Sequence, residues 1–230
     1  MPPFRFTDRE DAGRELASML AGIAQPPLVV LGVPRGGVVV ALPIALRLGA
    51  PLGVAFARKV TVSGAPELAL GAVDEDGELI VDIVTVHQLQ VPRDMLHRAR
   101  WAAYAELDRQ RQEYAPPSFR SELPRCTVVV VDDGLATGLT VRATVAWLRR
   151  HAARQVIVAA PCASDSAATW LVREADRLVC PVIERQFQAV SLYYDAFPPV
   201  TDAEVLECLK RARGAVSEPA RARRRGAVTI

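Results

Sequence analysis

The stretch VVVVDDGLATGLT, residues 128–140, decides the fold class of this chain. Four consecutive valines favour a strand that is buried on both faces of a parallel sheet. Asp132 and Asp133 follow at its carboxyl end, where open α/β sheets bind their ligands. The loop 134–140 is rich in Gly and Thr and precedes an apolar helical stretch, a pattern that presents backbone N–H groups to a phosphate. The two halves together suit a ribose 5-phosphate, which has vicinal hydroxyls for the acids and a phosphate for the loop.

Two other phosphate motifs do not fit this loop. A Walker A loop needs a lysine that reaches the β- and γ-phosphates, and residues 134–140 contain none. A dinucleotide fingerprint needs GxGxxG in the first strand-to-helix turn, which here reads GVPRGG. The remaining alternative is a buried strand that ends in an acidic turn and a helix cap.

The stretch resembles the signature with which type I phosphoribosyltransferases bind 5-phosphoribosyl 1-pyrophosphate (PRPP). The resemblance implies that Asp132 and Asp133 bind the ribose 2- and 3-hydroxyls. It also implies that the loop binds the 5-phosphate, partly through its backbone, with Ala136, Thr137, Gly138, Leu139 and Thr140.

A second candidate site lies near the N-terminus, in LVVLGVPRGGVVVALPIALRLG at 28–49. This pattern predicts a buried strand, a tight turn and an apolar helix. Arg35 is a cation beside Gly36 and Gly37, two residues that let the backbone approach a ligand closely. By resemblance to the family, these three residues hold the pyrophosphate of PRPP. The alternative is an ordinary turn between a strand and a helix.

Lys59 is the third candidate. The chain has 28 Lys and Arg residues, but Lys59 and Lys210 are its only lysines. Lys59 ends an apolar strand predicted at 52–58, and a mobile point charge there suits a pyrophosphate group. With Asp132 and Asp133 it forms the predicted catalytic set; a plain surface lysine is the alternative. The resemblance places a flexible lid after this strand, where Glu67 either assists the incoming base or is a solvated carboxylate.

The alternation of strands and helices predicts an α/β fold with a mostly parallel central sheet flanked by helices. We expect one domain at 1–212, with a small hood at about 74–115 and a basic, disordered tail at 213–230. Predicted strands are 28–31, 52–58, 69–73, 78–84, 126–131, 155–160 and 177–182. Predicted helices are 7–21, 38–48, 92–114, 139–151, 164–175 and 201–211, the first with a capping box that begins at Thr7.

The composition of the chain bears on its cellular location and on its partners. No apolar run is long enough for a membrane span, and the first residues lack a signal-peptide pattern. The four cysteines lack metal-ligand spacing, so we expect reduced core thiols and a cytoplasmic protein. The net charge is +2, and residues 211–230 hold six arginines against one glutamate. A solvated tail is favoured over nucleic-acid contact.

The whole chain, over about residues 5–210, resembles a little-characterised group of predicted phosphoribosyltransferases through PRGG, PELALGAV, DDGLATGLT and YYDAF. The resemblance implies Mg²⁺-dependent transfer of ribose 5-phosphate from PRPP to a heterocyclic base, as in nucleotide salvage. Mg²⁺ would arrive with PRPP and have no direct protein ligand, and self-association is one option. Ala136 stands where enzymes for 6-oxopurines carry an acid, which argues against such a base.

Two questions stay open at this stage. Tyr193 and Tyr194 either stack on a base or pack in the core. The rival function is a non-catalytic sensor of PRPP or nucleotides that contacts nucleic acid through its arginine-rich tail.

Overall fold

A five-stranded parallel sheet forms the centre of the computed structural model, which describes residues 4–62, 65–115 and 117–225, without the side chains of 62, 65–67 and 216–225. The strand order is β2-β1-β6-β7-β9, and every neighbouring pair is parallel. The register places Val30 of β1 beside Val129 of β6, which lies beside Ile157 of β7. The strand bounds are β1 (Leu28–Gly32), β2 (Leu52–Val54), β6 (Thr127–Val131), β7 (Gln155–Ala159) and β9 (Arg177–Val179). The predicted α/β class is confirmed.

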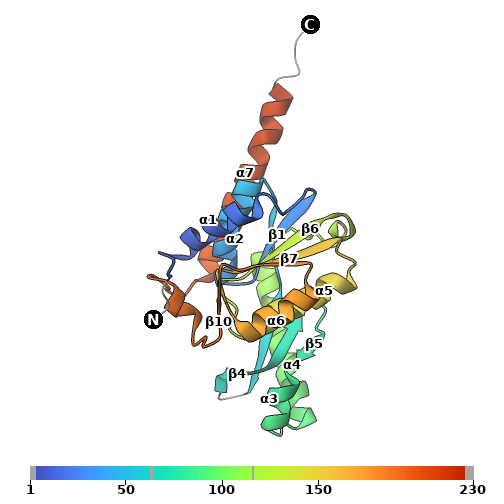
Figure 1. The fold of residues 1–230 in the computed structure, drawn as a ribbon. Helices are drawn as coiled ribbons and strands as arrows, with labels where there is room; N and C mark the ends of the chain where they lie inside the picture. The colour runs from blue at the N-terminus through green and yellow to red at the C-terminus, as the bar shows by residue number, and fades with distance from the viewer. Residues whose placement is uncertain (1–3, 63–64, 116, 226–230) are drawn as a thin grey trace.

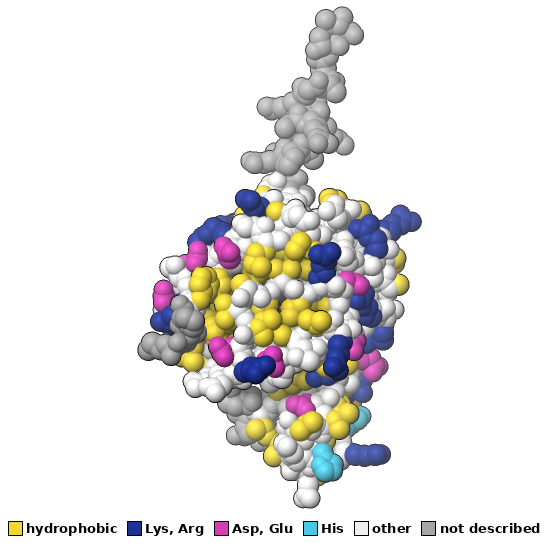
Figure 2. Space-filling view, in the orientation of Figure 1, with side chains coloured by type: hydrophobic (Ala, Val, Ile, Leu, Met, Phe, Trp, Pro, Cys, Tyr) yellow, Lys and Arg dark blue, Asp and Glu magenta, His cyan; other side chains and the backbone are white. Residues whose placement is uncertain are grey.

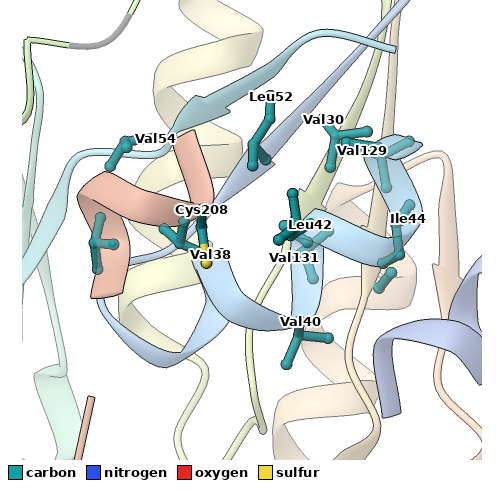
Figure 3. Close-up of a cluster of buried hydrophobic side chains, with 14 of the residues drawn as sticks. Val30, Val38, Val40, Leu42, Ile44, Leu52, Val54, Val129, Val131 and Cys208 are labelled. Carbon is teal, nitrogen blue, oxygen red and sulfur yellow. The ribbon is translucent and has the colours of Figure 1, made fainter. Parts of the chain in front are cut away.

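Helices cover both faces of this sheet (Figure 1). One face packs against α1 (Arg9–Leu20), α2 (Gly36–Leu48) and the start of α7 (Asp202–Arg225). The other packs against α5 (Leu139–Arg150) and α6 (Asp165–Glu174). Figure 3 shows the first core, where Val38 and Leu42 of α2 meet Val129 and Val131 of β6. Val128 and Val130 belong to the second core, so the run of valines supplies both faces in alternation.

A separate antiparallel sheet lies beside the central one, in the lower half of Figure 1. It has the order β3-β4-β5, with β3 (Ala57–Val62), β4 (Ala65–Asp74) and β5 (Leu79–Val81). The long helix α4 (Arg93–Tyr114) contacts β3 and β4, and the short helix α3 (Ile83–Gln88) contacts β4. Buried Asp74 shapes the β4–β5 turn, because its Oδ1 accepts the N–H groups of Asp76 and Glu78, each at 3.0 Å. The predicted hairpin is confirmed, and the small sheet begins at Ala57, before the expected hood.

Four predicted elements differ from the structure. The strand predicted at 78–84 ends at Val81, because Asp82 caps helix α3, which begins at Ile83. The strand predicted at 52–58 is two strands, β2 and β3, because the chain leaves the central sheet after Val54 and pairs antiparallel with β4 from Ala57. The strand predicted at 177–182 ends at Val179, and β10 (Val182–Glu184) pairs with β8 (Cys162–Ser164) in a two-stranded sheet that was not predicted. The N-cap of α1 is Asp8, whose carboxylate accepts the N–H of Asp11.

The last helix also runs further than predicted. α7 continues to Arg225 instead of ending near residue 211, so helical backbone covers much of the expected tail. The disorder of residues 213–230 in solution stays a prediction. Two short 3₁₀ helices, η1 (Leu123–Arg125) and η2 (Val190–Tyr193), complete the described elements.

The surface mixes charged and apolar side chains. In Figure 2, hydrophobic side chains gather in the middle of one face, and Lys, Arg, Asp and Glu lie around them. In the part of the chain that the structure describes, no helix is long and apolar enough to cross a membrane. All four cysteines are free thiols; Cys126, Cys162 and Cys208 are buried and Cys180 is half-buried.

Candidate active site

A cleft of about 1260 Å³ opens between the carboxyl edge of the central sheet and the wall formed by β3 and α4. Segments far apart in the sequence meet there. They are the loops that follow β1 and β6, strand β3, helix α4, the start of α1 and residues 197–200. Among the predicted site residues, Arg35, Gly36, Lys59, Asp132, Asp133, Ala136, Thr137, Gly138 and Thr140 line the cleft.

The two acids lie at the end of β6 in different hydrogen-bond networks. The Oδ1 atom of Asp132 accepts the N–H of Asp133 at 2.9 Å. The Oδ2 atom of Asp133 accepts from Nε of Arg9 at 2.8 Å, an ion pair that is largely shielded from solvent. The main-chain carbonyl of Asp133 accepts the hydroxyl of Tyr194 at 2.6 Å. The backbone and one carboxylate oxygen of Asp133 are therefore fixed.

Both carboxyl groups are harder to ionise than a free aspartate. Burial raises the pKa of Asp132 well above its ordinary value, and the neighbouring charge of Asp133 raises it further. Burial also raises the pKa of Asp133, while Arg9 opposes the shift. The positive charge of Lys59 lowers the pKa of both acids, so Lys59 acts on them across the cleft. Such a pair favours ligands that donate hydrogen bonds.

The loop after β6 leads into an open helix N-terminus. Gly138 is the N-cap of α5 with φ = 67°, a left-handed conformation that glycine adopts without steric cost. It provides no side-chain cap, and the first turn of α5 carries no acid. Ser164 fixes the loop, because its hydroxyl donates to the carbonyl of Ala136 at 2.6 Å. The N–H of Leu139 has only a long hydrogen bond, 3.5 Å, to Oγ1 of Thr137, so this weakly capped turn and the helix dipole suit an anion.

Two predicted residues lie behind the cleft and not on it. Leu139 is buried against Ala143 and Ala57, and its backbone N–H donates to Oγ1 of Thr137 at 3.5 Å, a long hydrogen bond that a ligand could replace. Gly37 packs against β6, and a Cβ at this position would lie 2.5 Å from the carbonyl oxygen of Val131. Gly37 therefore allows the β1–α2 turn to approach the acids.

Arg35 faces the cleft but already has partners. Its Nε lies 3.2 Å from Oδ1 of Asp202, and one terminal nitrogen donates to the carbonyl of Val200 at 3.0 Å. Lys59 differs, because it is exposed on β3 and has no ion pair within the described residues. Lys59 is thus the more available of the two cations for an anionic ligand.

The aromatic pair is structural. Tyr193 and Tyr194 are both almost fully buried, and Tyr193 stacks on Phe187 with ring centroids 5.1 Å apart. The side chain of Glu67, together with residues 63–64 of the expected lid, lies outside the described residues.

Sequence reasoning missed several residues of the cleft. Arg9 comes from the first turn of α1, and no local motif connects it with an acid 124 positions away. Phe197 lines the cleft beneath the Arg9 guanidinium, which lies 3.7 Å from the ring centroid. The helix predicted at 92–114 was given no role in a site, but α4 forms the far wall of the cleft through Met95, Arg98, Ala99, Ala102, Ala103, Glu106 and Gln110.

Comparison with known proteins places this architecture in a family. Two strains of Mycobacterium tuberculosis carry curated relatives named "Putative phosphoribosyl transferase", each 38% identical over 207 residues that cover 90% of this chain. The chain spans about half the length of these relatives, 47%. The crystal structure of TT1426 from Thermus thermophilus is also 38% identical, with a TM-score of 0.71 over 90% of this chain and 99% of that one. Residues 6–196 match the model of the phosphoribosyl transferase domain, and the chain belongs to this family.

Proposed function

We propose that this protein transfers the ribose 5-phosphate of PRPP to a nitrogen of a heterocyclic base and releases pyrophosphate. Three kinds of group line one cleft, and this observation carries the proposal. They are the two adjacent acids Asp132 and Asp133, the start of α5, whose N-cap residue provides no side-chain cap, and Lys59, which forms no ion pair with a described residue. These groups match the hydroxyls, the 5-phosphate and the pyrophosphate of PRPP in chemical type.

In this proposal Asp132 and Asp133 accept hydrogen bonds from the ribose hydroxyls. The backbone of residues 136–140 binds the 5-phosphate at the start of α5, with Thr137 and Thr140 able to add hydroxyl donors. The β1–α2 turn with Arg35 and Gly36 lies on the same cleft for the pyrophosphate. An approach of pyrophosphate to Arg35 would compete with Asp202 for the guanidinium.

The reaction is a displacement at C1 of the ribose. The bond from C1 to the pyrophosphate oxygen breaks, and its electron pair leaves with pyrophosphate. A lone pair of a ring nitrogen of the base forms the new bond to C1, and a proton that this nitrogen carries is released to solvent. Positive charge develops on the ribose, and the two adjacent carboxylates stabilise it electrostatically. Lys59 offsets the negative charge of the leaving group. The protein otherwise acts by holding the reactants in line.

Mg²⁺ is proposed to enter as part of the substrate, Mg·PRPP. Mg²⁺ prefers oxygen ligands and commonly binds through phosphates, waters and one or two carboxylates. The phosphate oxygens of PRPP and bound waters would hold the ion, and we assign it no direct protein ligand, because Asp132 and Asp133 are assigned to the ribose hydroxyls. Among the described residues, no group of three or more His, Cys, Asp and Glu side chains forms a separate metal site.

The acceptor base and the cellular setting belong to the proposal as well. Ala136 offers no charged group to a base, which keeps adenine, pyrimidine and pyridine bases in consideration. Cytoplasmic nucleotide salvage and self-association remain predictions.

The test is pyrophosphate release from Mg·PRPP by the purified protein with a panel of purine, pyrimidine and pyridine bases. Release that depends on one base supports the transferase and names its acceptor class. Saturable PRPP binding without release under any base would contradict turnover and favour the PRPP sensor.

A further inference from the structure

Arg9 joins three parts of the molecule at the edge of the cleft. The residue is only 8% exposed, although it belongs to the first turn of a surface helix. Its Nε donates to Asp133 at 2.8 Å, a terminal nitrogen donates to the carbonyl of Pro198 at 2.8 Å, and the guanidinium lies over Phe197. Helix α1, the end of β6 and the segment before α7 therefore meet at one planar cation.

This arrangement restricts the carboxylate of Asp133. Arg9 occupies Oδ2, and Gly36 closes the same side, since a Cβ at Gly36 would lie 1.8 Å from that oxygen. Tyr194 fixes the main chain of Asp133 through its carbonyl. In the described part of the chain, the side chain that donates to this carboxylate is Arg9, at Oδ2, and the remaining backbone donor is the N–H of Asp133 itself, so Oδ1 can still accept from a ligand.

We propose that Arg9 is a positioning residue for PRPP, which holds Oδ2 of Asp133 so that Oδ1 faces a ribose hydroxyl. The inference rests on the proposed function, because PRPP is the ligand. A lysine cannot reproduce the arrangement, since a single ammonium lacks the planar fork that reaches Asp133 and Pro198 while it stacks on Phe197.

The charge of Arg9 matters as well as its geometry. Burial favours the protonated form of Asp133, and the acid Asp132 lies next to it. The cations Arg9 and Lys59 favour its ionised form. Tyr194 and Cys162 are the other titratable groups near it, and burial raises the pKa of both, which keeps them neutral. Removal of Arg9 should let Asp133 keep its proton to higher pH. The protonated acid does not accept a hydrogen bond from a hydroxyl as a carboxylate does.

The experiment compares Arg9→Gln and Arg9→Lys with the wild-type protein. Arg14→Gln is the matched control, because Arg14 lies on the same helix, pairs with Glu10 and Asp11, and is exposed. The carboxyl titration of Asp133 is followed by ¹³C NMR without ligand, and Mg·PRPP affinity is measured by calorimetry across pH.

We expect Arg9→Gln to move the Asp133 titration to higher pH and to weaken Mg·PRPP binding about tenfold or more, as loss of a charged hydrogen bond implies. The acid limb of its binding profile should move upward with the titration. Arg9→Lys should keep the titration near that of the wild type and regain only part of the affinity. Arg14→Gln should change neither.

Folded Arg9 variants with an unchanged Asp133 titration and unchanged Mg·PRPP affinity would overturn the inference, even if their melting temperature fell. If Arg9→Gln does not fold, Arg9→Lys decides, and wild-type affinity in that variant would overturn the geometric role. A wild-type protein that binds no Mg·PRPP would instead overturn the proposed function, and the ligand-free titration separates the two failures.

Discussion

Asp132 and Asp133 are neighbours in the chain but differ in what surrounds them. Oδ2 of Asp133 forms an ion pair with Nε of Arg9 at 2.8 Å. The side chain of Asp132 instead accepts a hydrogen bond from a backbone N–H. Burial and the charge of Asp133 therefore raise the pKa of Asp132 with less compensation. When an acid has a higher pKa in the folded than in the unfolded protein, the protein becomes less stable as the pH rises from the unfolded-state pKa to the folded-state pKa.

Asp132→Asn should therefore stabilise the protein at neutral pH while it weakens PRPP binding. Asparagine keeps an oxygen for the N–H of Asp133 and removes the buried charge. We expect a gain on the order of 1 kcal/mol in the free energy of unfolding at pH 7, as is common when a functional charge is removed. The gain should vanish below about pH 4, where the acid is protonated in both states.

Chemical denaturation at pH 7 and pH 3.5 measures this difference. Asp133→Asn is the informative comparison, because it leaves the buried cation of Arg9 without its acid and should destabilise the protein. Equal stability of the wild type and Asp132→Asn at both pH values would contradict the electrostatic account of Asp132.

At this scale the sequence predicts the acids and misses their partners. Residues 132–140 form a continuous motif whose chemistry follows from residue types and order. Arg9 and Tyr194 reach Asp133 from positions 124 and 61 residues away, and only the folded chain brings them together. The sequence alone also does not show whether Tyr194 is a buried hydrogen-bond donor or an exposed residue that stacks on a base.

Among the elements, the turn between β1 and α2 depends on backbone contact. A Cβ at Gly37 would meet backbone on two sides, at 2.5 Å from the oxygen of Val131 and 2.9 Å from Cα of Asp132. Neither atom belongs to a flexible side chain, so the turn or the end of β6 would have to move. The candidate pyrophosphate turn and the ribose acids are thus one packed unit.

Gly37→Ala should lower the free energy of unfolding by about 1–3 kcal/mol, the usual range for overpacking, and weaken Mg·PRPP binding by displacing Asp132. Gly22→Ala is the control, because a Cβ at Gly22 would meet no atom within 4 Å. Thermal unfolding and calorimetry test both effects. A Gly37→Ala protein with wild-type stability and affinity would show that the close packing has no functional consequence.

Element boundaries show what periodicity can and cannot predict. The strands β1, β6 and β7 were predicted to within one residue at each end because apolar runs with clear ends mark them. The run from Leu52 to Arg58 is equally apolar, but its first half pairs with β1 and its second with β4. Local composition does not say which sheet a strand joins, since that choice depends on distant partners.

In the whole molecule, the cleft lies between two sheets that carry different candidate groups. The central sheet supplies the acids, the phosphate loop and the β1–α2 turn, and the small sheet supplies Lys59 through β3. Lys59 is exposed and forms no ion pair with any described residue, so its charge is available to a ligand. Its electrostatic effect on both acids is the link between the two halves.

Lys59→Gln should reduce pyrophosphate release by at least about tenfold, because the leaving group loses a nearby cation. Stability should stay within about 0.5 kcal/mol of the wild type, as for other exposed substitutions. The other lysine provides the control: Lys210 is exposed on α7 and pairs only with Glu207 among the described side chains, so Lys210→Gln should leave release unchanged. Equal loss in both variants would indicate a general charge effect instead of a site.

The most direct measurement of the central claim is a calorimetric titration of Mg·PRPP into the wild type, Asp132→Ala and Asp133→Ala. We predict saturable binding by the wild type and affinity losses of about tenfold to a hundredfold in each variant, the range for charged hydrogen bonds. Circular dichroism should show that both variants remain folded. Wild-type affinity in both folded variants would contradict the assignment of the acids to the ribose of PRPP.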